Sequence, residues 1–285
     1  MPDRPDPDAL LRHLSEAEQR ASRARFKVFF GAAPGVGKTF AMLQEAHRRK
    51  ADGVDVVVGV VETHGRPETM ALVSSLEVLP RKACFHRGVS LEAFDLEAAL
   101  ARRPRMILMD ELAHTNAPGC LHGKRWQDVL ALLDAGIDVY STLNVQHLES
   151  LQEVVAQITG IRVQERVPDT VLERTDELEL VDISVEDLLA RLAEGKIFIP
   201  EAARHATERF FRRGNLLALR ELALRRTAEL VDADMRRYRE AQGIQATWAA
   251  GQRLMVGITP QGSSEPLIRE TRRLAEALGA SWMAV

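Results

Sequence analysis

The sequence predicts an α/β fold built on a mostly parallel sheet with flanking helices. Three apolar runs predict it. Residues 26–30 lead into a glycine-rich loop and then into a helical segment free of Gly and Pro. Residues 54–61 are rich in valine, as in a strand buried on both faces of a parallel sheet. Residues 106–109 are apolar and are followed by two carboxylates, which would lie at the edge where open α/β sheets bind ligands.

The loop after the first strand contains a phosphate-binding motif. Residues 32–39 match G-x-x-x-x-G-K-[ST], with Ala32 in place of the first glycine. In such a loop the backbone N–H groups hold phosphates, Lys38 reaches the β- and γ-phosphates, and Thr39 ligates Mg²⁺. We therefore predict a P-loop NTPase-like sheet that binds a nucleoside triphosphate and Mg²⁺. The predicted nucleotide contacts in this loop are Ala33, Pro34, Gly35, Val36, Gly37, Lys38, Thr39 and Phe40.

Composition excludes other classes of protein. A net charge of −3 offers no general attraction to nucleic acid. Cys84 and Cys120 lack a metal-ligand spacing and suit a reducing compartment. No apolar run approaches the roughly 18 residues of a membrane span, and residues 1–8 do not resemble a signal peptide. We expect a cytoplasmic chain without a membrane span or a nucleic-acid partner.

The ends of the next two strands supply polar side chains. After the valine-rich run, Glu62 and His64 would orient a water or contact the γ-phosphate; a polar loop with a histidine–backbone hydrogen bond is an equally good interpretation. After the third run, Asp110 would hold Mg²⁺. Glu111 would act as the catalytic base that polarises an attacking water or hydroxyl.

A strand at 137–142 places Asn144 at the same edge, where we expect it to contact the γ-phosphate. The guanine signature Asn-Lys-x-Asp is absent, which favours ATP over GTP. Lys124 or Arg125 would suit an arginine finger. The favoured interpretation is instead a surface charge that pairs with Asp128 or another neighbour.

The remaining elements follow from apolar periodicity and from Gly and Pro breakers. Helices are predicted at 9–24, 68–79, 94–102, 126–134, 148–159, 201–211 and 216–239, and a helix capped by Ser184 and Asp187 extends to Glu194. Strands are predicted at 83–85, 162–168 and 179–183, the second as an edge strand closed by Pro168. We interpret the arginines of 201–239 as a solvated or ion-paired face rather than an RNA-binding surface.

The predicted domain order has five parts. An N-terminal helical arm, 1–24, precedes the nucleotide-binding domain, 25–185. An all-helical connector, 186–242, and a linker, 243–251, follow. Residues 252–285 have the pattern strand–helix–strand, the start of a flavodoxin-like α/β domain, which cannot bury its own faces. We therefore expect the chain to end inside a domain.

Five stretches resemble one known family. They are Phe-Phe-Gly-Ala-Ala-Pro-Gly-Val-Gly-Lys-Thr (29–39), Val-Gly-Val-Val-Glu-Thr-His-Gly-Arg (58–66), Met-Asp-Glu-Leu-Ala-His-Thr-Asn-Ala-Pro-Gly (109–119), Asn-Val-Gln-His-Leu-Glu-Ser-Leu (144–151) and Arg-Gly-Asn-Leu-Leu-Ala-Leu-Arg-Glu-Leu-Ala-Leu-Arg-Arg-Thr (213–227). They are similar to the N-terminal cytoplasmic region of the KdpD family, the osmosensitive potassium-channel sensor histidine kinases of bacteria. The resemblance extends over essentially the whole chain.

The resemblance implies a P-loop sensor domain and the start of a universal-stress-protein-like domain. In the family these parts precede four membrane spans and a histidine kinase core that controls high-affinity potassium uptake through a response regulator. The present sequence has neither a phosphoacceptor box nor ATP-lid glycine motifs, so autophosphorylation by this chain alone is not expected. The implied partners are ATP, the remainder of the sensor kinase and its response regulator.

Three functions remain open from the sequence. The first is a regulatory module in which ATP–Mg²⁺ binding biases the helical tail and the attached kinase. The second is an enzyme, either a slow ATPase or a phosphotransferase that uses Glu111 as a base towards a protein hydroxyl. The third is a scaffold with a vestigial loop. The oligomeric state is also open, a dimer included.

Overall fold

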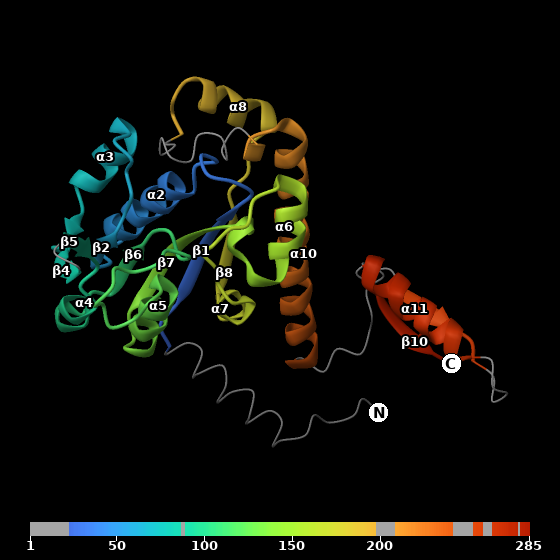
Figure 1. The fold of residues 1–285 in the computed structure, drawn as a ribbon. Coiled ribbons are helices and arrows are strands. Elements are labelled where there is room, and N and C mark those ends of the chain that lie inside the picture. Colours follow the sequence, from blue (N-terminus) through green and yellow to red (C-terminus); the bar gives the residue numbers. More distant parts are fainter. Residues whose placement is uncertain (1–22, 87–88, 198–208, 242–252, 259–263, 279) are drawn as a thin grey trace, which may run out of the picture. The chain divides into compact units, whose positions relative to one another are not determined.

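The computed structural model describes residues 23–86, 89–197, 209–241, 253–258, 264–278 and 280–285. The chain forms two compact units that divide at Ala233/Asp234, inside helix α10 (Arg213–Ala241). The first unit contains a six-stranded sheet in the order β3-β2-β6-β7-β1-β8, and its strands pair in parallel. The predicted α/β fold with a mostly parallel sheet and flanking helices is confirmed (Figure 1).

Strands and helices alternate through most of the first unit. The strands are β1 (Phe26–Gly31), β2 (Val56–Val60), β3 (Glu77–Val78), β4 (Lys82–His86), β5 (Val89–Ala93), β6 (Met106–Met109), β7 (Asp138–Asn144) and β8 (Glu177–Leu180). The helices are α2 (Lys38–Ala51), α3 (Pro67–Ser74), α4 (Leu96–Arg102), α5 (Arg125–Asp134), α6 (Gln152–Thr159), α7 (Asp169–Glu173) and α8 (Val185–Ala193), followed by α10. Two 3₁₀ turns, η1 (Val145–His147) and η2 (Glu149–Leu151), join β7 to α6.

The strands bury side chains on both faces of the sheet. Along β1, Phe29 belongs to one apolar cluster, whereas Val28 and Phe30 belong to the other, as the two-residue period of a strand requires. Helices α2 and α3 cover the Phe29 face. The opposite cluster includes α4 and α5, and it also takes Leu188 from α8 and Leu219 from α10. Side chains of α8 and α10 therefore share the core of the sheet.

The strand order decides which loops meet. Strand β7 lies between β1 and β6, with Gly31 opposite Asn144 and Met109 opposite Ser141. The carboxyl end of β7 consequently lies between the glycine-rich loop 32–37, which follows β1, and the carboxylates that follow β6. Open α/β sheets bind their ligands at this edge.

One predicted strand is absent from the structure, and one strand of the structure was not predicted. Residues 162–168 form no strand; an isolated bridge between Leu148 and Val167 is the pairing in this segment. The strand predicted at 83–85 is β4, and it pairs antiparallel with β5, which the sequence analysis does not predict. Both errors concern short segments, in which pairing partners rather than local pattern decide the conformation.

Two predicted helices are shorter than expected. The helix predicted at 68–79 ends at Ser74, where Ser74 and Ser75 turn their hydroxyls back to preceding carbonyls and β3 follows. The helix predicted at 148–159 begins at Gln152, because the residues before it form η1 and η2. It ends at Thr159, as predicted, and Gly160 caps it in the left-handed conformation.

The arginines of α10 form the predicted ion-paired face. Arg213 pairs with Glu186, Arg220 with Asp182 and Arg226 with Asp169, at N–O distances of 2.6–3.0 Å. The helix predicted at 216–239 lies within α10.

The second unit contains a strand–helix–strand segment, as predicted. Strand β9 (Arg253–Val256) pairs in parallel with β10 (Ser281–Ala284), and α11 (Glu265–Leu278) joins them. Within the described ranges, no helix is long and apolar enough to cross a membrane. The predictions for 1–22, 201–208 and the linker 243–251 lie outside the described residues.

Candidate functional site

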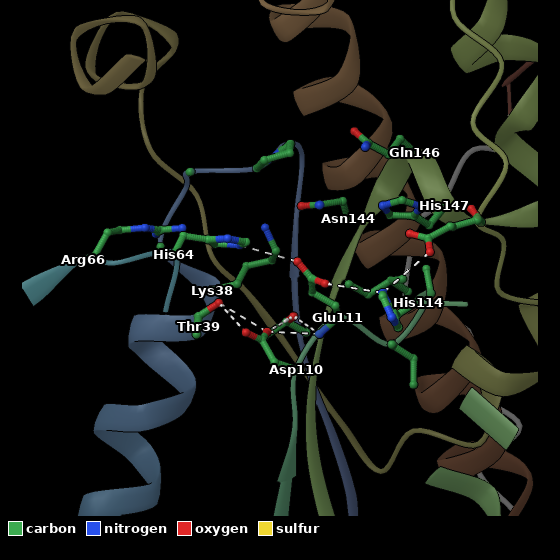
Figure 2. Close-up of a pocket in the computed structure, with 18 residues that line it drawn as sticks. Lys38, Thr39, His64, Arg66, Asp110, Glu111, His114, Asn144, Gln146 and His147 are labelled. Atoms are coloured by element: carbon green, nitrogen blue, oxygen red, sulfur yellow. Dashed lines mark hydrogen bonds and ion pairs between the residues drawn. The ribbon is translucent and has the colours of Figure 1, made fainter. Parts of the chain in front are cut away.

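A pocket of about 190 Å³ lies at the carboxyl ends of β1, β6 and β7 (Figure 2). Its walls come from the glycine-rich loop, the turn after β2, the segment after β6 and the end of β7. The fold gathers many of the predicted site residues around this one space. They are Pro34, Gly35, Gly37, Lys38, Thr39, His64, Asp110, Glu111 and Asn144.

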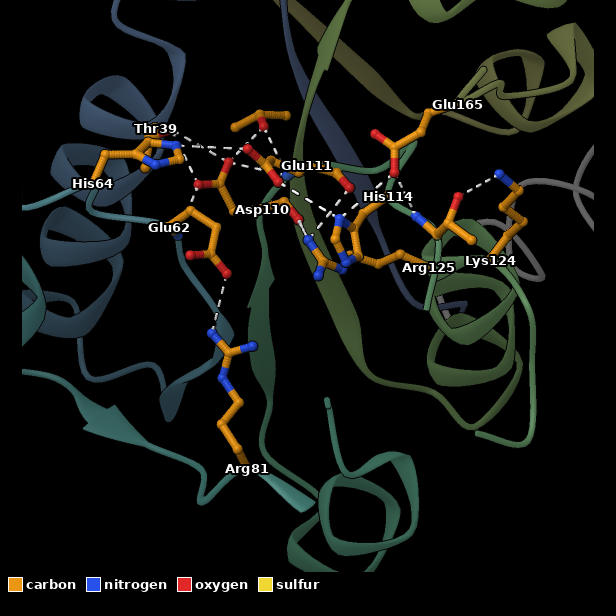
Figure 3. Close-up of polar contacts among 12 residues, drawn as sticks. Thr39, Glu62, His64, Arg81, Asp110, Glu111, His114, Lys124, Arg125 and Glu165 are labelled. Carbon is orange, nitrogen blue, oxygen red and sulfur yellow. Dashed lines mark hydrogen bonds and ion pairs between the residues drawn. The ribbon is translucent and has the colours of Figure 1, made fainter. Parts of the chain in front are cut away.

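Four predicted residues do not line the pocket: Ala33, Val36, Phe40 and Glu62. The first two are buried in the core below the loop, and the third is 39% exposed on α2. The carboxylate of Glu62 pairs with Arg81 at 3.3 Å and points away from the pocket (Figure 3). Its backbone N–H, in contrast, donates to Oδ2 of Asp110 at 3.2 Å. Glu62 therefore contacts the site through its backbone N–H, and its carboxylate does not face the pocket.

The glycine-rich loop needs glycine at two positions that line the pocket. Gly35 and Gly37 have φ angles of 90° and 110°, a region that disfavours side chains. A Cβ on Gly35 would also lie 2.4 Å from Cδ1 of Ile197. Ala32 is not among the residues with positive φ, which explains why alanine is tolerated at the first position of the motif.

The segment that follows β8 also contacts the glycine-rich loop. Nη1 of Arg191, in α8, donates to the carbonyl oxygen of Gly35 at 3.0 Å. Side-chain atoms of Leu188 and Ile197 approach the same glycine. No local sequence pattern predicts this contact, because it joins residues that are 156 positions apart.

Lys38 begins α2 at the base of the loop. Its side chain is buried, and Nζ donates to the carbonyl oxygen of Ala33 at 3.0 Å. Burial lowers the pKa of Lys38 to about 8, although the charges of Asp110 and Glu111 act in the opposite direction. A cation that is so poorly solvated is stabilised when an anion enters the pocket.

Asp110 is buried beside Lys38, and its carboxylate accepts four hydrogen bonds. The donors are Oγ1 of Thr39 (3.1 Å), Oγ1 of Thr142 (2.5 Å) and the backbone N–H groups of Glu62 (3.2 Å) and Glu111 (3.1 Å). Burial and the charge of Glu111 raise the pKa of Asp110, while hydrogen bonds from Thr142, Glu62 and Thr39 oppose this rise.

The Thr39–Asp110 pair suits a hard cation that also takes phosphate oxygens. Mg²⁺ prefers oxygen ligands and is usually held by one or two protein groups plus substrate phosphates and water. No group of three or more His, Cys, Asp or Glu side chains in the described part of the chain could hold a metal by itself. The Thr39 hydroxyl and the Asp110 carboxylate are oxygen donors of the kind that Mg²⁺ takes beside phosphate.

Glu111 presents an ionised carboxylate to the pocket. Its backbone is left-handed, with a φ of 55°, an uncommon conformation that is concentrated at functional sites. Its carboxylate oxygens lie 3.7 Å from Nε2 of His64 and 3.9 Å from Nδ1 of His114. The contact with His64 lowers the pKa of Glu111, and the same contact raises the pKa of His64.

Arg125 is not an arginine finger in this structure, and it does not line the pocket. It is buried below the pocket, where Nη1 donates to the backbone carbonyl of Asp110 at 2.6 Å and contacts that of Glu111 at 3.4 Å (Figure 3). Nζ of Lys124 donates to the hydroxyl of Thr115 at 2.7 Å. Arg125 thus supports the backbone of the two carboxylates.

The favoured interpretation, a surface charge that pairs with Asp128 or another neighbour, holds only in part: Lys124 bonds the neighbouring Thr115, whereas Arg125 is buried and Asp128 has other partners among the described residues. Asp128 accepts a hydrogen bond from Nδ2 of Asn116 at 2.6 Å and lies 2.8 Å from Nδ1 of His122. These contacts stabilise the segment that precedes α5.

The pocket contains residues to which the sequence analysis gives no role. They are Arg66, Leu112, Ala113, His114, Thr142, Leu143, Gln146, His147 and Glu165. Glu165 lies in the segment wrongly predicted as a strand, and its backbone oxygen lies 2.9 Å from Nδ1 of His147. Burial lowers the pKa of His147. Thr142 and Gln146 lie two positions before and after Asn144. The same run of polar residues that predicted Asn144 at the pocket therefore could have predicted these two residues there.

Two amide side chains in the pocket leave hydrogen-bond acceptors unused. Oδ1 of Asn144 and Oε1 of Gln146 are buried without a partner in the part of the chain that the structure describes. Buried polar atoms in folded proteins nearly always have partners, so orphaned atoms that line a pocket indicate a site for a polar ligand.

Comparisons with known proteins give one family. The family described as "KdpD: Osmosensitive K+ channel His kinase sensor domain" matches residues 22–231. The chain is 55% identical over 286 residues to the Sensor protein KdpD of Escherichia coli (strain K12), which covers 100% of this chain and 31% of that protein. Identity to the Sensor protein KdpD of Clostridium acetobutylicum is 45% over 283 residues, with 99% and 31% covered.

A third relative is the Putative sensor protein KdpD of Synechocystis sp. It is 46% identical over 256 residues, which are 90% of this chain and 68% of that protein. The chain spans about a third of the length of the first two relatives.

Proposed function

This chain belongs to the KdpD family of osmosensitive K⁺ channel His kinase sensor domains, and on that premise we propose that it is an ATP–Mg²⁺-binding regulatory module. The module serves a potassium-responsive, two-component sensor histidine kinase that controls high-affinity potassium uptake. Its partners are the remainder of the kinase and a response regulator. In this proposal the first unit is a P-loop NTPase-like domain, and the β9–α11–β10 segment begins a flavodoxin-like domain.

One observation carries the nucleotide proposal: Lys38 and the Thr39–Asp110 pair meet in one pocket. A buried lysine beside glycine-rich backbone supports binding of phosphates. A threonine hydroxyl 3.1 Å from a buried carboxylate supports Mg²⁺ beside them. The absence of a guanine signature in the sequence favours ATP.

The contact between Arg191 and Gly35 supports regulation rather than simple storage of a nucleotide. The loop that would hold phosphate is bonded directly to α8. Side chains of α8 and α10 pack in the same core. A change in the loop on binding would therefore be transmitted to the helices that continue the chain.

The test is the Lys38→Ala variant, measured by unfolding with and without ATP–Mg²⁺. ATP at about 100 times its Kd adds about 2.7 kcal/mol to the unfolding free energy of the wild type. Loss of the lysine removes charge-assisted contacts worth about 1.5–3 kcal/mol, so most of this increment disappears. Lys50→Ala removes the same charge from an exposed position on α2, where Nζ donates to Ser75, and should keep the increment. Equal increments in wild type and Lys38→Ala contradict the proposal.

A second candidate function is that of an enzyme, either an ATPase or a phosphotransferase that acts on a protein hydroxyl. The position and the ionisation of the Glu111 carboxylate favour it. This carboxylate is ionised, faces the pocket and lies within reach of two histidines. Steady phosphate release or transfer to protein that vanishes in Glu111→Gln, with ATP binding retained, favours the enzyme. Turnover that persists unchanged in Glu111→Gln rules out that role for Glu111.

A further inference from the structure

Arg66 lines the pocket together with Gly37 and Lys38. In Figure 2 its guanidinium extends from the turn after β2 towards Lys38. Burial lowers the pKa of Lys38, and the positive charge of Arg66 acts in the same direction. Two cations that face one pocket repel each other, and an anion bound between them removes that penalty.

The guanidinium of Arg66 has no protein acceptor in the described structure. No ion pair or side-chain hydrogen bond of Arg66 occurs among the described residues, and its Nε is buried without a partner. The carboxylates of the neighbouring segments are engaged elsewhere, Glu111 by His64 at 3.7 Å and Glu62 by Arg81 at 3.3 Å. A buried guanidinium nitrogen without an acceptor indicates that a ligand supplies one.

The backbone holds Arg66 in place without help from a ligand. Its N–H donates to the carbonyl of Thr63 at 3.0 Å, and its carbonyl accepts from the N–H of Met70 at 2.9 Å. Before it, His64 and Gly65 adopt positive φ angles of 49° and 71°, which form the turn after β2. A side chain on a turn anchored at both ends is preorganised for binding.

We propose that Arg66 binds the terminal phosphate of a nucleoside triphosphate and so makes the pocket selective for ATP over ADP. This inference rests on the proposed nucleotide site and adds a specificity-determining residue to it. The loop holds phosphates that both nucleotides have, and Lys38 reaches the β-phosphate of either nucleotide. Arg66 stands on a separate segment, and its planar fork matches phosphate oxygens bidentately. A diphosphate leaves this guanidinium without an acceptor.

Calorimetric titration of the full chain tests the inference. The ligands are the β,γ-imido analogue of ATP, which is not hydrolysed, and ADP, both in EDTA so that metal does not contribute. The wild type binds the triphosphate analogue more tightly than ADP. In Arg66→Gln the affinity for the analogue falls about 10- to 100-fold, while the affinity for ADP stays within about twofold. Arg66→Lys keeps the charge without the fork and gives an intermediate loss.

Arg48→Gln is the matched control. It removes one positive charge from an exposed side chain of α2 that pairs with Glu45 at 2.8 Å, and it leaves both affinities unchanged. If Arg66→Gln weakens both nucleotides equally, or neither, the inference is overturned while the nucleotide site stands. If the wild type binds neither nucleotide, in EDTA or after Mg²⁺ is added, the proposed function falls with it. Equal melting temperatures of Arg66→Gln and wild type without ligand establish that the variant is folded.

Discussion

Arg191 donates a hydrogen bond from Nη1 to the carbonyl oxygen of Gly35 at 3.0 Å. This hydrogen bond ties α8 to the glycine-rich loop, and the side chains of Leu188, also in α8, and Ile197 pack against the same glycine. The loop therefore cannot change its conformation without changing its contacts with α8. If phosphate binding moves or stiffens the loop, α8 is the first element to respond.

The Arg191→Met variant should uncouple α8 from the loop. In the wild type, ATP–Mg²⁺ slows amide hydrogen exchange in the loop and in α8, because both are held together. In the variant the loop remains protected by the ligand, but the slowing in α8 is lost. Arg213→Met is the control, because it removes an exposed ion pair to Glu186 of α8 and leaves the loop contact intact. Equal protection of α8 in wild type and Arg191→Met argues against this route.

Gly35→Ala should be more destabilising than alanine at another left-handed glycine. The new Cβ would lie 2.4 Å from Cδ1 of Ile197, in addition to the strain at a φ of 90°. We expect a loss of about 2–5 kcal/mol in unfolding free energy, measured in urea. Gly53→Ala, with a φ of 84° and open space around the Cβ, should cost only about 1–2 kcal/mol.

The double variant Gly35→Ala/Ile197→Ala separates the two causes. Removing the larger side chain relieves the clash but not the backbone strain, so the two substitutions should cost less together than their sum. If the two losses of unfolding free energy simply add, the clash with Ile197 is not a cause of the destabilisation by Gly35→Ala.

Asp110→Asn should separate metal binding from phosphate binding. Nucleotide affinity in EDTA stays nearly unchanged or improves, because a negative charge near the phosphates is removed. The gain in affinity on adding Mg²⁺ falls sharply, because the carboxylate bonded to Thr39 at 3.1 Å would be a ligand of that ion. Calorimetric titration with ATP in EDTA and then in Mg²⁺ measures both quantities. An undiminished Mg²⁺ increment in the variant refutes the role of Asp110.

His147 should make stability fall in mild acid. Burial lowers its pKa from the ordinary value of 6.5, against opposing contributions from Glu165. As the pH falls below 6.5, the unfolded chain binds a proton that folded His147 does not, so the unfolding free energy decreases until the pH reaches the lowered pKa. The neutral variant His147→Gln lacks this term, so its stability relative to wild type improves between pH 7.5 and 5. Urea unfolding across that range measures the difference, and a difference independent of pH contradicts the assignment.

The sequence of neighbouring residues was sufficient to predict the strands, the loop and the helix that surround the pocket. The strand–loop–helix around Lys38, the apolar strand that ends at Asp110 and the strand that ends near Asn144 are each encoded by neighbouring residues. Apolar runs, glycines and caps act within a few positions, and for that reason these elements could be predicted. The shorter segments were predicted less well, because β5 and 162–168 depend on partners elsewhere in the chain.

The sequence by itself determined which chemical groups stand at strand ends; only the tertiary structure decided which of them meet. Placing β7 between β1 and β6 brings Thr142 within 2.5 Å of Asp110. Folding also places Arg125 below the pocket, turns the Glu62 carboxylate away and leaves Nε of Arg66 without an acceptor among the described residues. Contacts such as Arg191–Gly35 join residues 156 positions apart. Their energies depend on the register of the sheet and on the packing of its helices, which no local pattern specifies.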